Sequence, residues 1–298
     1  RRQRQMCIRD RLLTVHNRIK KTIECLTSLL DSNYDDYNFS FDIYLTDDGS
    51  TDNSTNILKQ NFSNAPLCIL QGDGNLFWNA GMINSWNSAL AKGGYDGYLW
   101  LNNDTIVFHN LWNELLAADQ YAQSTYGLSG IYVGSTCDVN GKLTYGGFNF
   151  ISRWTLKDKF CIPNGNFQKC QCGHGNVTYI SHNVVEKMGV LFDGYRHGGG
   201  DHDYTYRAYR NGFPILVLRS YVGICENDHK EDGFYEFVRM KLGDRIKFLQ
   251  SPWGYNLHNT LLFSKRCFPY RYPFVWLTGY IKAFFPRIYM KLYRNLRK

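Results

Sequence analysis

Aspartates stand at three places in this sequence where a hydrophobic or glycine-rich run gives way to polar residues. DIYLT is followed by DDGSTD, YLWL by NNDT, and HGGG by DHDY. Carboxylates can accept hydrogen bonds from a ribose, bind a divalent cation, or take a proton from a reacting hydroxyl group. The three segments therefore supply candidates for ligand recognition, metal binding and proton transfer.

The segment DDGSTD places two carboxylates, Asp47 and Asp48, directly after a predicted strand. Gly49 permits a tight turn, and Ser50 or Thr51 can cap the next helix. A capped turn needs only one of the two acids. Ligands bind at the carboxyl ends of parallel strands, where a second acid can hydrogen-bond a ribose or a base edge. The pair therefore indicates either nucleotide binding or a capped turn.

The stretch GDGNLFWNAGM, residues 72–82, combines glycines with polar and aromatic side chains. The glycines let the backbone approach a ligand closely, and Asn75, Trp78 and Asn79 offer hydrogen bonds and a stacking surface. No Gly-Lys-Ser/Thr follows, so the stretch is not a phosphate-binding P-loop, and it lacks the Rossmann glycine spacing. It indicates either a ligand-binding loop or a loop packed by its own aromatic residues.

The segment LNNDT ends a hydrophobic strand with amide oxygens and one carboxylate, that of Asp104. Mg²⁺ and Mn²⁺ take one or two carboxylates together with phosphate oxygens and water. The segment therefore predicts a divalent-cation site, and an Asx-turn that closes the strand is the alternative.

The segment HGGGDHDYTYRAYR carries Asp201 and Asp203 at a predicted helix start. Carboxylates are stabilised at a helix N-terminus, which is a sufficient structural reason for both. Acids two residues apart do not share a helical face, so we expect only one of them to face a ligand. An acid that faces a cleft can act as general base, and the other can cap the helix or bind Arg207.

Strands alternate with helices over the first 125 residues, which predicts right-handed βαβ units and a parallel sheet. Strands are expected at 12–15, 41–45, 67–70 and 97–101, with helices between them. The later elements expected are a strand at 177–180, helices at 182–188, 203–211 and 234–250, a strand at 213–218, and an irregular loop over 152–175.

Together these segments resemble the family 2 glycosyltransferases of the GT-A fold, in order and spacing, from about Leu12 to His229. TVHNRIKKTIECLTSLL resembles their opening strand and helix, and DIYLTDDGSTD their nucleoside-binding strand end. LNNDT resembles their metal-binding motif and GDHDYTYRA their acidic catalytic motif. The resemblance implies an α/β fold, with a Rossmann-like mixed sheet flanked by helices over 11–233 and a helical, basic and aromatic extension over 234–298. Bacterial enzymes described as rhamnosyl- or other hexosyltransferases of surface polysaccharides look most similar.

The resemblance also assigns roles by position. Asp201 would be the catalytic base, although Gly200 replaces the usual Glu before it. Asp104 and His229 would bind the metal, with a surface-loop histidine as the alternative for His229. The residues expected to contact the nucleotide-sugar are Thr14, Asn17, Asp47, Asp48, Asn75, Trp78, Asn79, Gly81 and Asn103. Asn103 stands where many relatives carry a first acid, so this motif carries fewer charges than the usual pattern.

The implied reaction is an inverting, metal-dependent transfer from a UDP- or dTDP-sugar to a glycan or lipid-linked acceptor, with Mn²⁺ or Mg²⁺ as cofactor. One alternative is a sugar-phosphate nucleotidylyltransferase, but TVHNRIK offers no glycine-rich loop with a basic residue. A second alternative is a non-catalytic nucleotide-sugar-binding protein, against which the presence of Asp48, Asp104 and Asp201 argues.

The net charge of +8 favours anionic partners, and the aromatic content of 16% suits flat or interfacial ligands. No nucleic-acid-binding motif is present, so we expect no such partner. Residues 268–298 mix aromatic and basic residues around Pro273, Gly279 and Pro286, which suits peripheral contact with an anionic membrane. Helices packed on the domain with a solvated basic face are the alternative. No apolar stretch is long enough to span a membrane.

Nine cysteines without framework spacing indicate free thiols in a reducing compartment, and hence the cytoplasm. The aromatic and basic C-terminal residues are compatible with a peripheral position on the inner face of the membrane. Cys161, Cys170, Cys172 and His174 could ligate zinc, but their spacing matches no standard knuckle, which favours loop thiols or a local disulfide. Residues 1–10, RRQRQMCIRD, are expected to be a translated sequencing adapter or a disordered basic tail, and are excluded from the fold.

Overall fold

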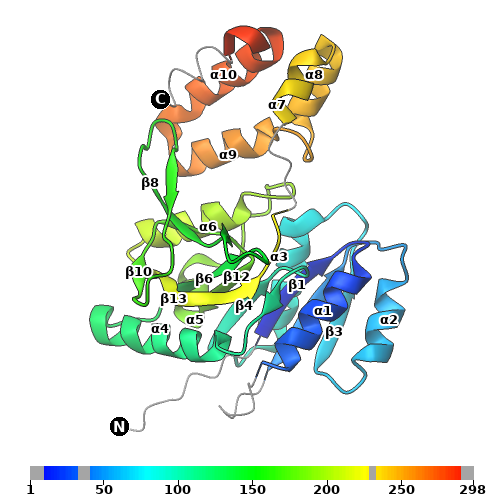
Figure 1. Ribbon diagram of the computed structural model, residues 1–298, viewed down its shortest axis with the longest axis vertical. Helices are drawn as coiled ribbons and strands as arrows, with labels where there is room; N and C mark the ends of the chain where they lie inside the picture. Colours follow the sequence, from blue (N-terminus) through cyan, green and yellow to red (C-terminus); the bar gives the residue numbers. More distant parts are fainter. Residues whose placement is uncertain (1–9, 33–40, 228–232, 290–298) are drawn as a thin grey trace. The chain divides into compact units, whose positions relative to one another are not determined.

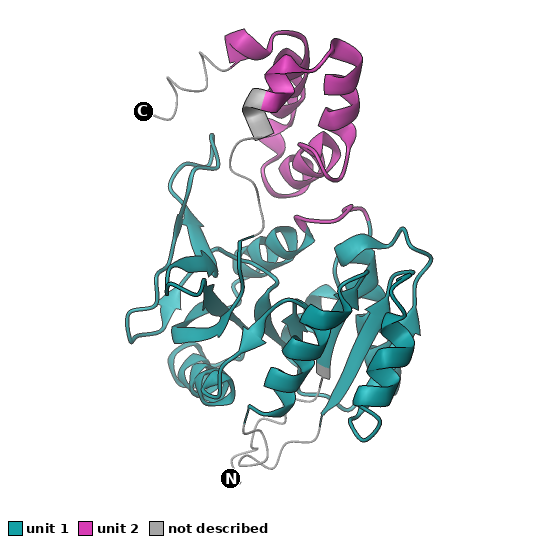
Figure 2. Cartoon of the chain, turned by 45° about the vertical axis from the view of Figure 1, so that its right-hand side comes forward, with its two compact units in different colours: residues 1–193, 200–227 teal, residues 194–199, 228–298 magenta. Residues whose placement is uncertain are grey.

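The computed structural model describes residues 10–32, 41–227 and 233–289. The chain divides into two compact units, coloured separately in Figure 2. The sheet unit contains residues 1–193 and 200–227, and the helical unit contains residues 194–199 and 228–298. Residues 1–9 of the predicted adapter and the predicted metal ligand His229 lie outside the described residues, and the domain boundary at 233/234 stays a prediction.

A mixed sheet forms the centre of the sheet unit (Figure 1). The four strands predicted first are parallel neighbours in the order β3-β2-β1-β4, as expected for βαβ units. They are β1 (Asp10–Val15), β2 (Asp42–Asp47), β3 (Leu67–Gln71) and β4 (Gly97–Leu101). The sheet then continues through β12 (Val177–Ser181), which is antiparallel to both its neighbours, β6 (Ile131–Cys137), β13 (Ile215–Ile224) and β10 (Gln168–Lys169). The short strands β5 (Ile106–Val107) and β7 (Leu143–Tyr145) pair with β13 and β6.

Helices cover both faces of this sheet, which is why its strands read as hydrophobic runs. Successive residues alternate between the faces: Leu13 packs in one hydrophobic cluster and Leu12 in the other. The first cluster contains residues of α1 (Ile19–Leu30), α2 (Ser54–Asn61) and α4 (Leu111–Tyr126). The second contains residues of α3 (Phe77–Lys92), α5 (His182–Met188) and α6 (Gly200–Arg210).

The prediction of an irregular loop over 152–175 is wrong in part. This region contributes β9 (Asp158–Phe160) and β11 (Cys172–Gly173), which pair with β8 (Gly147–Phe150) in a small antiparallel sheet, and also β10. Strands of two or three residues are too short to show a period-two pattern, so the sequence does not reveal them.

The described part of the helical unit contains α7 (Gly233–Arg239), α8 (Leu242–Gln250), α9 (Leu257–Cys267), the 3-10 turn η2 (Pro269–Arg271) and α10 (Tyr272–Phe284). The single helix predicted over 234–250 is two helices, because Lys241 adopts an extended conformation (ψ 157°). None of the helices described is long and apolar enough to cross a membrane.

The helical unit is held together by a close contact between α9 and α10 and by hydrogen bonds to the segment 194–199. Gly279 lets α10 approach α9, since a Cβ there would lie 2.7 Å from a methyl carbon of Leu257. The segment 194–199 is held by Asn259, whose side-chain amide nitrogen donates to the Arg196 (2.6 Å) and Gly198 carbonyls and whose oxygen accepts from the Arg196 N–H (3.1 Å). Asn256 adds a bond to the Arg196 carbonyl (3.0 Å).

Candidate functional site

The DDGSTD and LNNDT segments lie at the carboxyl ends of β2 and β4, the two parallel neighbours of β1. In the register of the sheet, Val15 pairs with Asp47, and Leu12 pairs with Trp100. The polar segments after β1, β2 and β4 therefore lie at one edge of the sheet (Figure 1), the edge at which open α/β sheets bind ligands.

The two acids of DDGSTD are buried and bonded within the protein. Asp48 is 3% exposed and accepts backbone N–H bonds from Gly74 (2.8 Å), Leu76 (3.2 Å) and Phe77 (2.8 Å). Asp47 accepts from the Ser50 N–H and the Thr55 hydroxyl. Asp48 thus shapes the glycine-rich loop and Asp47 closes the turn before α2, so direct contact of either with a nucleoside stays a prediction that these bonds do not support.

Asn17 ties the end of β1 to the turn after β2. Its backbone N–H donates to the Ser50 hydroxyl (3.0 Å), and its side-chain oxygen accepts from the Thr51 N–H (2.7 Å). Thr14 packs against Gly81 of α3, where a Cβ would lie 2.4 Å from the Thr14 methyl group. The buried Thr14 hydroxyl has no hydrogen-bond partner. Asn17, Thr14 and Gly81 therefore lie at the predicted edge, with Gly81 serving the close approach of α3 to β1.

The stretch 72–82 divides between exposed and buried polar groups. Asn75 is exposed, and its backbone N–H donates to the Asp73 carboxylate. Trp78 donates its indole N–H to the Asn102 side-chain oxygen (2.8 Å). Asn79 is fully buried and donates to the Phe192 carbonyl (2.9 Å). Asn75 is therefore available to a ligand, whereas Trp78 and Asn79 connect α3 to other elements of the site.

The contact of Asn79 with Gly200 explains why a glycine precedes Asp201. A Cβ at position 200 would lie 1.9 Å from the Asn79 side-chain oxygen. Any larger residue at this first position of α6 would displace either the helix or Asn79. Asn79 thus accounts for the glycine at position 200.

Asp201 lies in the first turn of α6 and is held at both carboxylate oxygens. One accepts from the Gly175 N–H (3.0 Å) and the other from the His202 N–H (2.9 Å). Burial raises the pKa of this carboxyl, but nearby His202 and His174 and the two backbone donors outweigh it, and the net pKa lies below the usual value. Asp201 is therefore a charged, fixed carboxylate at neutral pH.

Asp201 lies beside a pair of histidines, His174 and His202, that the sequence motifs do not predict. The rings of His174 and His202 lie 4.8 Å apart, and the His202 Nε2 lies 3.9 Å from an Asp201 oxygen. Burial and the neighbouring His202 lower the pKa of His174 to about 4, and its Nδ1 lies 2.8 Å from the Gly146 carbonyl. The DHD sequence was the available signal for His202, and nothing in the sequence places His174 next to it.

Asp203 takes the structural role predicted for it. It is fully buried and accepts from Arg207 Nε at 2.8 Å, one helical turn along α6. Asn103 also faces inward: it is 8% exposed and donates its side-chain amide to the Thr22 hydroxyl (3.0 Å). Its predicted contact with the donor stays a prediction.

Asp104, the predicted metal ligand, carries an ion pair with Arg18 (2.7 Å). Its other oxygen lies 3.6 Å from the Cys225 thiol, whose pKa burial and the Asp104 charge raise to about 12. Arg18 and Cys225 were not predicted, because neither position carries a sequence signal for contact with Asp104. The cysteine stays protonated and can donate to the carboxylate.

The strand end fits a cation that binds together with substrate phosphates. No group of three or more His, Cys, Asp or Glu side chains within the described residues could hold a metal by itself. Mg²⁺ and related ions need only one or two protein carboxylates when phosphate oxygens and water complete the coordination. Asp104 supplies one such carboxylate, and Arg18 would have to share or release it.

The zinc site considered for Cys161, Cys170, Cys172 and His174 does not form, because the four side chains have separate partners. The Cys161 sulfur accepts from Asn149 (3.2 Å), the Cys172 thiol lies 3.9 Å from the His202 carbonyl, and Cys170 is packed in the core. All eight cysteines within the described residues are free thiols, so a local disulfide is absent there too.

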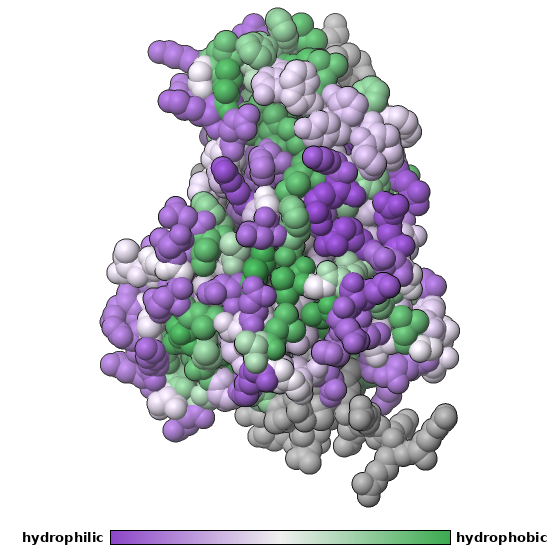
Figure 3. Space-filling model, turned by 180° about the vertical axis from the view of Figure 1, so that it is seen from behind, coloured by the Kyte–Doolittle hydropathy of each residue, from purple (hydrophilic) through white to green (hydrophobic). Residues whose placement is uncertain are grey.

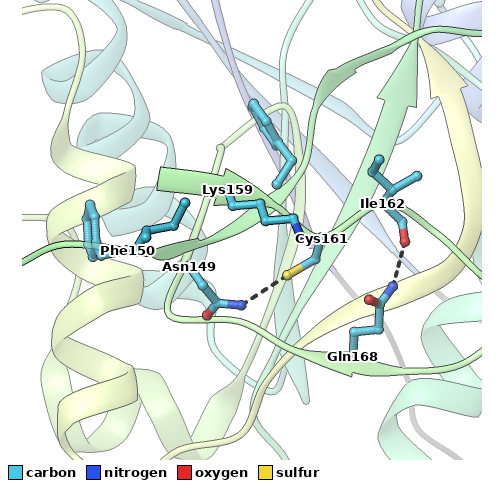
Figure 4. Close-up of a pocket in the computed structure, with 8 residues that line it drawn as sticks. Asn149, Phe150, Lys159, Cys161, Ile162 and Gln168 are labelled. Atoms are coloured by element: carbon cyan, nitrogen blue, oxygen red, sulfur yellow. Dashed lines mark hydrogen bonds between the residues drawn. The ribbon is translucent and has the colours of Figure 1, made fainter. Parts of the chain in front are cut away.

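A separate hollow of about 540 Å³ lies on the small antiparallel sheet (Figure 4). Two of its polar side chains are bonded within the protein: Asn149 donates to the Cys161 sulfur, and Gln168 donates to the Ile162 carbonyl (2.7 Å). None of the acids predicted for catalysis lines it. The hollow is therefore distinct from the edge that carries Asp104.

Comparison with known proteins agrees with this architecture. The sequence pattern of the family described as "Glycosyl transferase family 2" matches residues 12–187. Among curated proteins, no sequence matches this chain.

Several solved structures share the fold. S. aureus TarS 1–349 in complex with UDP has a TM-score of 0.58 and 14% identity, covering 97% of this chain and 91% of that one. GalNAc-T7 with UDP, GalNAc and Mn²⁺ has a TM-score of 0.54 and 13% identity, covering 73% and 43%. A Pyrobaculum calidifontis mannosyltransferase with GDP-Man and Mn²⁺ has a TM-score of 0.50 and 13% identity, covering 96% and 78%. These similarities show the fold that was predicted.

Proposed function

The chain belongs to glycosyl transferase family 2, and we propose that it is an inverting, metal-dependent enzyme. It transfers a sugar from a nucleotide-sugar donor. We propose a UDP- or dTDP-sugar as that donor and Mn²⁺ or Mg²⁺ as the cofactor. The binding of UDP by TarS, and of Mn²⁺ with UDP or GDP-Man by two other proteins of this fold, supports the choice of ligand class.

One chain of contacts carries the proposal. The Asn102 side chain, next to the Asp104 segment, accepts from Trp78, and Trp78 packs against Gly175, where a Cβ would lie 2.5 Å from its ring. The Gly175 N–H in turn donates to Asp201. The end of β4 and the first turn of α6 are thus connected through one aromatic side chain.

The proposed roles follow from these positions. Asp201 accepts the proton of the acceptor hydroxyl as that oxygen attacks the anomeric carbon. Asp104 holds the divalent cation, which acts as a Lewis acid on the diphosphate leaving group. Arg18, 47% exposed and paired with Asp104, supplies a second positive charge beside the same carboxylate. Asn75, Asn17 and the backbone of the glycine-rich loop shaped by Asp48 are the proposed donor contacts.

The acceptor is proposed to be a glycan or lipid-linked hydroxyl in surface polysaccharide synthesis, with a rhamnosyl or other hexosyl group transferred. We place the enzyme in the cytoplasm, peripheral on the inner membrane face. The free thiols of the described cysteines suit a reducing compartment.

A panel of UDP-, dTDP- and GDP-sugars, assayed with Mn²⁺, with Mg²⁺ and with EDTA, tests the proposal. We expect release of nucleoside diphosphate from one donor class, lost in EDTA, and inversion of the anomeric configuration seen by NMR. Asp104→Ala should abolish metal-dependent binding of nucleoside diphosphate in calorimetry, whereas the exposed Asp244→Asn should not.

The results separate the alternatives. Consumption of a sugar phosphate and a nucleoside triphosphate with release of pyrophosphate would identify a nucleotidylyltransferase. Nucleotide binding without turnover across the panel would identify a binding protein. Undiminished activity in EDTA would overturn the metal dependence.

A further inference from the structure

We infer that the outer face of α10 is a docking surface for an anionic lipid bilayer. The inference deepens the proposed peripheral location by naming the surface that makes the contact. It does not depend on the catalytic chemistry, because it rests on residues of the helical unit alone.

Helix α10 is hydrophobic on all sides, and among the described residues of its unit one side of it packs into a core. Val275, Gly279 and Ala283 are buried, and Val275 and Ala283 belong to a small core with Leu249 and Leu257. On the outer side, Trp276 is 49% exposed, Leu277 51% and Phe284 46%. A helix that is apolar all round is normally buried against a second apolar environment.

Two polar side chains of α10, Lys282 and Thr278, interact within the helical unit. Lys282 is the sole charged residue between Tyr272 and Phe284, and it lies over the Tyr255 ring (3.8 Å). Burial lowers the pKa of Lys282 to about 8. The Thr278 hydroxyl donates to the Phe274 carbonyl of its own helix (2.7 Å). The outer face therefore offers apolar and aromatic surface to any partner.

The exposed Trp276 and Phe284 are joined by the partly buried Tyr280 in a row of aromatic side chains. Trp276 and Tyr280 have ring centroids 4.9 Å apart, and Tyr280 and Phe284 stack at 6.5 Å. The row continues past the helix to Phe285, 58% exposed, and Ile288, 56% exposed. Hydrophobic side chains of the C-terminal helices reach the surface in Figure 3. Tryptophan and tyrosine favour the headgroup level of a bilayer, since their rings are apolar and their N–H or O–H groups polar.

Charge identifies the partner as anionic lipid rather than a second copy of the chain. Residues 1–232 carry 24 acidic and 21 basic side chains, a net charge of −3, whereas residues 233–298 carry 2 and 13, a net charge of +11. Lys265, near the end of α9, and Arg287, after α10, are exposed. Two copies that met through this region would repel each other, while phosphatidylglycerol-type headgroups would attract it.

Co-sedimentation of the full chain with phosphatidylcholine vesicles, with and without phosphatidylglycerol, tests the inference. We expect binding that requires phosphatidylglycerol and weakens with salt. The variant Trp276→Ser/Leu277→Ser/Phe284→Ser should bind on the order of tenfold or more weakly. The matched variant Val139→Ser/Ile151→Ser/Trp154→Ser alters three apolar residues of the sheet unit that are more exposed than those of α10, and it should bind as the wild type. Lys265→Glu and Arg287→Glu should each lower the affinity for phosphatidylglycerol vesicles by roughly fivefold or more.

Three results would overturn the inference: equal binding of the α10 variant and the wild type, binding without phosphatidylglycerol, or no vesicle binding at all. Sedimentation velocity adds a fourth. If the wild type is a dimer that the α10 substitutions convert to a monomer, a second copy covers this face. Donor hydrolysis by the α10 variant should equal that of the wild type, so failure of vesicle binding and failure of the proposed catalysis are read separately.

Discussion

Hydrogen-bonded polar side chains mark the interior of the sheet unit, whereas exposed apolar side chains gathered on one helix, α10, mark the helical unit. The sheet unit buries acids and amides, among them Asp48, Asp203 and Asn79, and bonds them to its own backbone and side chains. The helical unit leaves Trp276, Leu277 and other apolar side chains exposed. Buried, hydrogen-bonded polar groups fix the positions of neighbouring side chains because the loss of a buried hydrogen bond is destabilising. A contiguous exposed apolar patch marks a surface that binds a partner. The two proposals accordingly place the chemistry in the first unit and membrane attachment in the second.

The strongest test of this contrast is the removal of the proposed base. Asp201→Asn keeps the shape of the side chain and removes its basicity, so the transfer rate should fall by roughly two to four orders of magnitude. Donor affinity and melting temperature should stay close to the wild type. Single-turnover kinetics, calorimetry and thermal unfolding measure the three quantities. If Asp203→Asn lost turnover at normal stability while Asp201→Asn stayed active, the wrong acid has been assigned.

The next test removes the carboxylate that shapes the glycine-rich loop. Asp48→Ala leaves three backbone N–H groups without their acceptor, which should lower the free energy of unfolding by about 3 kcal/mol or more. Urea unfolding measures the change. Asp73→Ala, at an exposed position of the same loop, is the control and should cost under about 1 kcal/mol. Equal effects would show that Asp48 does not organise the loop.

A smaller effect is expected at the entry to α6. Gly200→Ala places a methyl group against the Asn79 oxygen, so it should destabilise the fold by about 1–3 kcal/mol and slow transfer by shifting Asp201. Asn79→Ala makes room, so the double variant should lose less stability than the two single variants together. A double-mutant cycle measures this coupling. Strict additivity would contradict the contact.

The smallest effect is a change in pH dependence. Because the Asp201 pKa is lowered, this carboxyl adds stability above the usual aspartate pKa, and the contribution is lost as the pH falls through the lowered value. The groups that face Asp201 are His202 and His174, with Asp158 acting on His174. His202→Gln removes the histidine interaction that lowers the Asp201 pKa, so the acid limbs of activity and stability should move to higher pH while the rate at neutral pH is kept. An unmoved limb would mean that His202 does not act on Asp201.

The sequence predicts some features of this structure better than others. The strands at 12–15, 41–45, 67–70 and 97–101 are confirmed because each is a short, mostly apolar run between polar segments, and the runs in β1, β2 and β4 are buried between helices on both faces of the sheet. The Asp203–Arg207 pair is confirmed because residues four apart share a helix face. The partners of Asp48 are backbone N–H groups, which carry no side-chain signal. Arg18 and Cys225 reach Asp104 across sequence separations of 86 and 121, which no local pattern encodes.

The path of the chain through residues 194–199 limits how this protein can be divided. The backbone passes between the two units at 193/194, 199/200 and 227/228, so the helical unit is not an appendage joined by one linker. A protein shortened at residue 227 would keep the segment 194–199 but lose Asn256 and Asn259, whose bonds hold it. The next residues are Gly200 and Asp201, so truncation would release the segment that leads into the base. An exchange of the C-terminal region between relatives would therefore have to include residues 194–199 as well.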